Sequence, residues 1–235
     1  MLDELSALLA AVGQGATREE FVRAIVENNV LRKSTASTRR ISAQRLTELY
    51  ALDTTVPIFR VLQRLWPVHP DAHSLLALLS GLARDPLLRS TAPTVLGLRE
   101  GQSFDRDATT EVLRIHAGNR LNEDILDKVV RNTAASWTQS GHLVGRTFKK
   151  RQRVKPSPTA VTMALFLGYL QGFRGTGLLR TLWCEALDST PEALAGMATR
   201  ASTAGAMRFR QSGDVVEIGF PDFLTKAENE MASHG

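Results

Sequence analysis

The fold prediction starts from a basic segment near the beginning of the chain, which reads Asn28-Asn-Val-Leu-Arg-Lys-Ser-Thr-Ala-Ser-Thr-Arg-Arg-Ile-Ser-Ala-Gln-Arg-Leu-Thr-Glu-Leu-Tyr50. It holds five arginines and lysines and a single acid, Glu48. The two asparagines tolerate a tight turn, and the hydroxyl of Thr35 or Ser37 can cap a following helix. The segment therefore predicts a turn and then a helix over residues 36–50.

The predicted helix has two different faces. Projected at about 100° per residue, its apolar side chains spread over one side: Ile41, Leu46, Leu49 and Tyr50. The opposite face holds small or polar groups: Ala36, Arg40, Ala43, Gln44 and Thr47. A helix that enters a DNA groove needs such a face, because small residues let the backbone approach and polar groups bond to bases or phosphates. Arg45 projects towards the apolar side, and a solvated basic face is the alternative.

The residues before this segment predict a partner helix. Thr17-Arg-Glu-Glu20 has the capping-box pattern that opens a helix over residues 18–27. Asn28 and Asn29 then end it. Two helices joined by a short turn give a helix-turn-helix outline over residues 18–50, although antiparallel helices in any bundle have the same outline.

The composition favours a helical protein with a polyanionic partner. Aromatic residues make up only 6% of the chain, and leucine and alanine recur throughout, which favours helices over sheets. The net charge of +5 points to a polyanion. A single cysteine, Cys184, excludes an intramolecular disulfide and a cysteine metal site. The expected fold class is mainly α: a helical bundle with helix-turn-helix and winged-helix elements and two small β-hairpins.

Apolar periodicity predicts further helices along the chain. Their expected ranges are 3–12, 53–66, 71–84, 108–117, 122–139, 159–173, 178–188 and 191–203, with another from Pro86 that Pro93 ends or kinks. Gly118-Asn119 marks a boundary between an N-terminal domain (1–119) and a C-terminal domain (120–235). The apolar run at 158–174 is too short and too polar for a membrane span, and the first residues lack the positive region of a secretory signal. A cytoplasmic protein without membrane contact is expected.

A strongly basic hairpin is predicted after helix 122–139, at residues 143–155. Six of the ten residues from 146 to 155 are basic and none is acidic: Arg146, Lys149, Lys150, Arg151, Arg153 and Lys155. A helix followed by a hairpin with a charged turn is the outline of a winged helix, whose wing lies along the phosphate backbone. Trp137 and Phe148 are expected to hold this hairpin in place. The alternative is a flexible basic loop that matters only for solubility.

A second hairpin is predicted at residues 206–220, with a less basic wing. Its turn is Ser212-Gly-Asp214, and its charges are mixed: Arg208 and Arg210 against Asp214 and Glu217.

Enzymatic sites are not evident. His69 and His73 stand four apart, but Pro70 lies between them and no fitting carboxylate follows. Gly175 and Gly177 do not extend to a phosphate-binding fingerprint. No arrangement of a nucleophile with a histidine can be assembled from the scattered single residues. We therefore expect a protein without catalytic activity, metal or cofactor.

The spacing of Asn29, Leu31, Thr35, Thr38 and Ile41 resembles the N-terminal motif of the BrxA family of BREX phage-defence systems. Further segments are similar to later parts of that family: Trp137-Thr-Gln-Ser-Gly-His-Leu-Val144, and residues 204–220. The chain departs from the family by lacking most of the aromatic residues of its opening segment. The resemblance implies a helical protein with winged-helix elements that binds double-stranded DNA, has no catalytic activity, and works beside other defence-system proteins.

Two DNA-binding surfaces are therefore predicted. The first consists of Arg32, Lys33, Arg39, Arg40 and Gln44. The second is the basic hairpin, with Arg146, Lys149, Lys150, Arg151, Arg153 and Lys155. Arg40 and Gln44 are the candidates for base contact, while the hairpin would hold phosphates without sequence preference. The alternatives are a protein-interaction adaptor within a multi-subunit assembly, whose basic hairpin meets an acidic partner, and an RNA-binding helical protein.

Overall fold

The computed structural model describes residues 1–213 and 215–233. It is mainly α-helical with two small antiparallel hairpins, which confirms the predicted mainly α class and the presence of the two hairpins. The first helices are α1 (Leu2–Ala11), α2 (Arg18–Val26), α3 (Ala36–Tyr50), α4 (Pro57–Leu65) and α5 (His73–Arg84). A middle part follows with α6 (Pro86–Ser90), α7 (Ala92–Leu96), α8 (Arg106–Ala117), α9 (Glu123–Gln139), β1 (Leu143–Val144) and β2 (Lys150–Arg151). The last part holds α10 (Pro158–Leu170), α11 (Leu182–Glu185), α12 (Pro191–Thr203), β3 (Arg208–Ser212), β4 (Val215–Gly219) and α13 (Lys226–Ser233).

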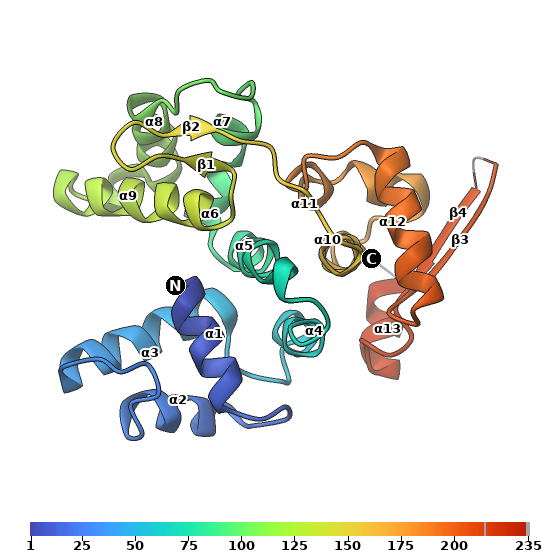
Figure 1. Cartoon of the computed structure of the whole chain (residues 1–235), viewed down its shortest axis with the longest axis horizontal. Coiled ribbons are helices and arrows are strands. Elements are labelled where there is room, and N and C mark those ends of the chain that lie inside the picture. Colours follow the sequence, from blue (N-terminus) through green and yellow to red (C-terminus); the bar gives the residue numbers. More distant parts are fainter. Residues whose placement is uncertain (214, 234–235) are drawn as a thin grey trace.

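Three groups of elements surround a central set of helices. Helices α4, α5 and α10 lie at the centre (Figure 1), where α10 packs against both α4 and α5. Around them lie α1–α3, then α6–α9 with β1 and β2, and then α11–α13 with β3 and β4 (Figure 1). Among the described residues, no helix combines the length and apolar character that a bilayer crossing requires.

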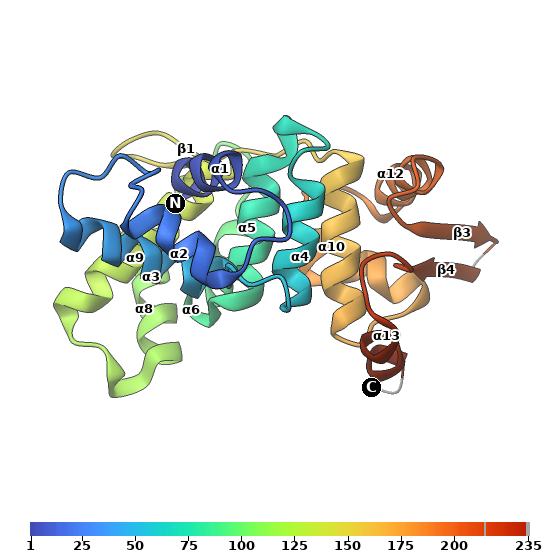
Figure 2. The same cartoon turned by 90° about the horizontal axis from the view of Figure 1, so that it is seen from below.

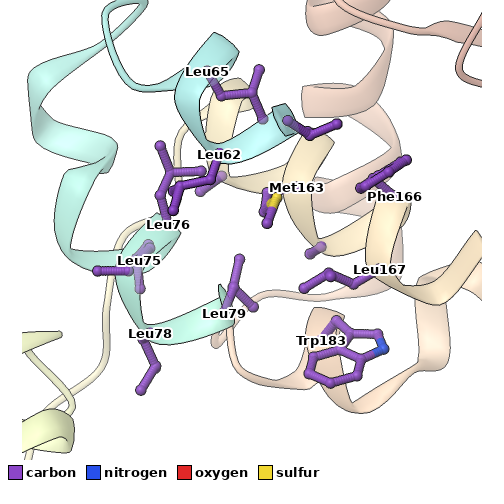
Figure 3. Close-up of a cluster of buried hydrophobic side chains, with 14 of the residues drawn as sticks. Leu62, Leu65, Leu75, Leu76, Leu78, Leu79, Met163, Phe166, Leu167 and Trp183 are labelled. Atoms are coloured by element: carbon purple, nitrogen blue, oxygen red, sulfur yellow. The ribbon is translucent and has the colours of Figure 1, made fainter. Parts of the chain in front are cut away.

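Helix α10 is the buried helix that the apolar run predicts. Every residue from Thr159 to Tyr169 is buried. Figure 3 shows Met163 of this helix facing leucines of α4 and α5, among them Leu62 and Leu76. A helix that is apolar all round must be enclosed by other elements, and here α4 and α5 cover one part of it while α11 and α12 cover another.

One hydrophobic core joins both halves of the chain. Its buried members run from Leu5 in α1 to Leu224 before α13. The predicted boundary at Gly118-Asn119 falls between α8 and α9, which pack together around a small separate cluster: Leu113, Leu126 and Val130. The main core therefore contains residues from both sides of the predicted boundary, and the small cluster also spans it.

Helix starts follow the predicted capping chemistry. Thr17 and Glu20 form a reciprocal capping box at α2, as predicted. Thr35 caps α3 by accepting from the Thr38 backbone N–H, which selects Thr35 over Ser37. These side chains satisfy N–H groups that would lack intrahelical partners.

One predicted helix is broken. Residues 178–188 were expected to be continuous, but they hold the end of a 3₁₀ segment (Gly175–Arg180) and the short α11. Thr181 between them is extended, with φ −79° and ψ 159°. Its hydroxyl donates to the Leu178 carbonyl at 3.1 Å, a local bond that competes with continued helix.

Candidate nucleic-acid interface

The predicted basic hairpin forms, and its stem is paired on both sides. Leu143 lies opposite Arg151, and Val144 opposite Lys150. On its other edge, β2 pairs with the loop before α8. There the Phe104 N–H donates to the Lys149 carbonyl at 2.8 Å, and the Gly101 N–H donates to the Arg151 carbonyl at 2.9 Å. The hairpin is thus held firmly at its base.

Arg151 is not available as the phosphate contact that the sequence predicts. Its side chain is fully buried and forms an ion pair with Asp188, whose side chain is 1% exposed. Burial alone would raise the pKa of Asp188, but hydrogen bonds from Arg151, the Val154 N–H and Arg153 outweigh it and lower that pKa. Arg151 and Asp188 therefore anchor the hairpin to the turn between α11 and α12, and no local pattern around Arg151 predicts this partner.

The other five cations of the hairpin differ in what they can offer a ligand. Arg153 is half exposed, and its Nη1 donates to Asp188 Oδ1 at 2.8 Å. Lys149 is half-buried, and its Nζ donates to the Gly145 carbonyl at 3.1 Å. Three remain exposed without an ion pair in the described part of the chain: Arg146, Lys150 and Lys155. These three are the hairpin's free charges.

The hairpin tip, residues 145–149, exposes an aromatic ring. Phe148 is 86% exposed, so the prediction that it holds the hairpin is wrong. Trp137 is fully buried and its Nε1 donates to the Thr91 hydroxyl at 2.8 Å. Its ring also lies edge-on to His142, one residue before β1, which fits its predicted anchoring role. The tip conformation needs glycine at position 145, which has φ +110° and whose added Cβ would lie 2.3 Å from the Phe148 carbonyl oxygen.

Helix α3 is rotated relative to its predicted faces. Ala43 is buried together with Leu46 and Tyr50, whereas Ile41 is 49% exposed. The reason is that α3 packs against both α2 and α5, so its buried stripe is set by two neighbours. Because of this rotation Arg45 is exposed to solvent, although the predicted orientation of α3 placed it towards the apolar side.

Two predicted contact residues of this first surface serve the fold. Arg39 is half-buried, and its Nη1 donates to the Val26 carbonyl at the end of α2, at 2.8 Å. Lys33 forms an ion pair with Glu4 of α1 at 3.0 Å. Their charges are therefore only partly available, whereas Arg32 and Arg40 are exposed.

The predicted base-reading pair lies together in a groove. Arg40 and Gln44 line a depression of about 450 Å³ between α2 and α3, which Arg18 also borders. Gln44 donates to Glu48 Oε1 at 2.8 Å, so a carboxylate shares this face. The groove thus has mixed charge, unlike the hairpin tip.

Helix α9 precedes the basic hairpin, and most of its exposed charges are already paired. Asp127 forms ion pairs with Arg106 of α8 and with Arg131 at 3.1 Å. Glu123 pairs with Arg114 at 3.0 Å. Lys128 is the one exposed cation of α9 without an ion pair in the described part of the chain, so most of the free positive charge of this region lies on the hairpin.

The two predicted contact surfaces lie toward the same end of the molecule. Both the start of α3 and the β1–β2 hairpin lie at the left of Figure 1, with α9 between them, and Figure 2 agrees. The second hairpin lies at the other end (Figure 2), and its Arg210 stands directly opposite Glu217. Asp214 of its predicted turn lies outside the described residues. Comparison with models of known families, with curated proteins and with solved structures finds no significant match.

Proposed function

We propose that this chain is a non-enzymatic, double-stranded DNA-binding protein whose main contact is the β1–β2 hairpin. The observation that carries the proposal is the set of exposed, unpaired cations on a hairpin with a buried anchor. Arg146, Lys150 and Lys155 have no carboxylate partner among residues 1–213 and 215–233, while Arg151 fixes the stem. Cations on a fixed support can neutralise phosphates without first losing much conformational freedom.

The order of elements supports the same proposal. An extended segment paired to β2 is followed by α8, α9 and the hairpin, which is the order of a winged helix. In our proposal the hairpin lies along the phosphate backbone and supplies affinity, while α3 makes a second contact at the same end of the molecule. Arg40 and Gln44 of α3 are the proposed base contacts.

Charge reversal with a charge-matched control tests the proposal. The double variant Arg146→Glu, Lys150→Glu removes two phosphate contacts. We expect weaker binding to a fluorescent duplex, and a plot of log affinity against log salt that is flatter by about two units. The control is Arg200→Glu, Arg208→Glu, which reverses two exposed cations of α12 and β3 and gives the same net charge. It should bind nearly as the unchanged protein does.

Each alternative has its own outcome in this experiment. Absence of duplex binding at low salt, or equal loss in the two double variants, contradicts the proposal. Preference for duplex RNA over DNA in direct competition favours the RNA-binding alternative. A partner protein that stays bound after nuclease treatment, without DNA affinity of the chain itself, favours the adaptor.

We propose a role in phage defence only on the resemblance to the BrxA family, which is carried by the spacing from Asn29 to Ile41 and by the segments at 137–144 and 204–220. The proposal predicts that the gene lies beside genes for other BREX components. A gene surrounded by unrelated metabolic genes would contradict the proposed pathway, although it would leave DNA binding untouched.

A further inference from the structure

The hairpin tip combines one large apolar ring with free positive charge. Phe148 is 86% exposed, the highest value among the exposed large hydrophobic residues of the described chain. Arg146 and Lys150, two positions away on either side, are exposed cations. An isolated exposed apolar residue is common on protein surfaces, but here it lies at the point that the proposed function brings to DNA.

Contacts on both sides of Phe148 define the conformation of the tip that exposes this ring. The close approach of Gly145 to the Phe148 carbonyl leaves no room for a Cβ, and Lys149 closes the turn through its bond to the Gly145 carbonyl. Immediately after Phe148, the Lys149 carbonyl accepts from the Phe104 N–H. The backbone is therefore held at Gly145, three residues before the ring, and at Lys149, directly after it, so a ligand can bury the ring with little further ordering of the hairpin.

We propose that Phe148 stacks on a nucleobase of the bound DNA, so that the hairpin favours duplexes with an unpaired or weakly stacked base. The inference rests on the proposed function and adds a ligand feature to the same site. Apolar side chains of DNA-binding proteins insert between base steps, and aromatic rings stack on unpaired bases regardless of base identity. The flanking cations would hold the phosphates on either side of that base.

A lipid surface is the competing ligand for an aromatic ring beside cations. Membrane-surface segments present a broad apolar face, commonly of several large residues along a helix. The tip offers a single ring on a five-residue loop, with the half-exposed Val144 just before it. The α3 surface at the same end is polar and charged except for Ile41, so no broad apolar face forms. DNA therefore fits these features better than a membrane does.

Substitution of the ring by alanine tests the inference on two duplexes of equal length. One is fully paired and the other carries a central single-base bulge, where the unstacking has already occurred. We expect the unchanged protein to prefer the bulged duplex. Phe148→Ala should lose about tenfold in affinity for it, since stacked aromatic side chains contribute about 5- to 150-fold per base. Its salt dependence should stay unchanged, because no charge is removed. The matched control, Phe173→Ala, removes a half-exposed ring after α10 and should leave both affinities unchanged.

A second variant reports stacking directly. Trp66, Trp137 and Trp183 are all buried, so a tryptophan in Phe148→Trp would be the exposed one in the described chain. Its fluorescence should be quenched when the bulged duplex binds.

The outcomes separate the inference from the proposed function. Salt-dependent DNA binding with unchanged Phe148→Ala affinity and no quenching overturns the stacking inference alone. Absence of any DNA binding overturns both. Loss of binding to phosphatidylserine vesicles in Phe148→Ala, with DNA binding unchanged, overturns the inference in favour of a membrane.

Discussion

At the scale of single residues, His142 gives the fold a pH dependence. Its ring is fully buried, with Nδ1 2.8 Å from the Ser140 hydroxyl and Nε2 2.9 Å from the Ala186 carbonyl. A neutral ring satisfies both if Nε2–H donates to the carbonyl and the hydroxyl donates to Nδ1. Burial lowers the pKa of His142 to about 4, and Asp188 offsets this only in part.

The lowered pKa of His142 makes the folded protein less stable at acidic pH. Because the folded pKa lies below the ordinary value, protons bind the unfolded chain more readily. The stabilisation is therefore complete above about pH 6.5 and is lost as the pH falls towards 4. In the unchanged protein, His142 should lower the free energy of unfolding by about 2 kcal/mol between pH 7 and pH 5. In His142→Gln, urea unfolding at the two pH values should show a decrease that is smaller by this amount. His116→Gln, the same substitution at an exposed position, is the control. A fall as steep in His142→Gln as in the unchanged protein would contradict the assignment.

Single-residue roles were only partly predictable from the sequence. Arg146 and Arg151 belong to the same basic run, and nothing local distinguishes them. Arg151 is buried because Asp188, 37 residues later, lies beside it in the fold. The exposure of Phe148 is not predictable locally, because aromatic residues are usually buried, whereas this ring lies on the loop that begins at Gly145, whose φ is +110°.

At the scale of elements, the hairpin depends on Gly145. Gly145→Ala combines a positive φ with a close backbone contact, so we expect unfolding free energy to fall by about 1–3 kcal/mol. Relaxation of the tip would displace Phe148 and weaken duplex binding as well. Gly101→Ala is the matched control, since its φ is +80° but no atom lies within 4 Å of the added Cβ. Gly101→Ala should lose unfolding free energy only through the strain of alanine at positive φ. Equal losses of unfolding free energy in the two variants would show that the contact of position 145 with the Phe148 carbonyl is unimportant.

The sequence predicts where helices and strands lie along the chain better than it predicts which face of a helix is buried. Helix α10 was predictable because its apolar run leaves no polar face, whichever neighbours surround it. The rotation of α3 was not, because Ala43 and Ile41 both suit a buried position and the choice between them is made by α2 and α5. The break at Thr181 likewise has no local signal, since the side-chain bond from Thr181 to the Leu178 carbonyl that accompanies it is one that a threonine within a helix can also form.

At the scale of the whole molecule, the shared core decides how the chain unfolds. A boundary near residue 119 predicts two units, yet α10 from the second half packs against α4 and α5 from the first. Removing either half would expose the apolar side chains at this junction, seen in Figure 3. Burial of such area is the main force that stabilises a domain, so the halves should lose stability together.

The native tryptophans allow this cooperativity to be measured. Trp66 follows α4 in the first half and Trp183 lies in α11 of the second, and both are buried. Two variants, each keeping one of them and carrying phenylalanine at the other tryptophan positions, are unfolded in urea. Within each variant, the midpoint from fluorescence should equal the midpoint from far-UV circular dichroism, because the local probe and the helices report one transition. Comparison within a variant cancels any stability lost through the substitutions. A Trp66 transition separated from the helical signal would instead indicate that the first half unfolds alone, as two independent domains would.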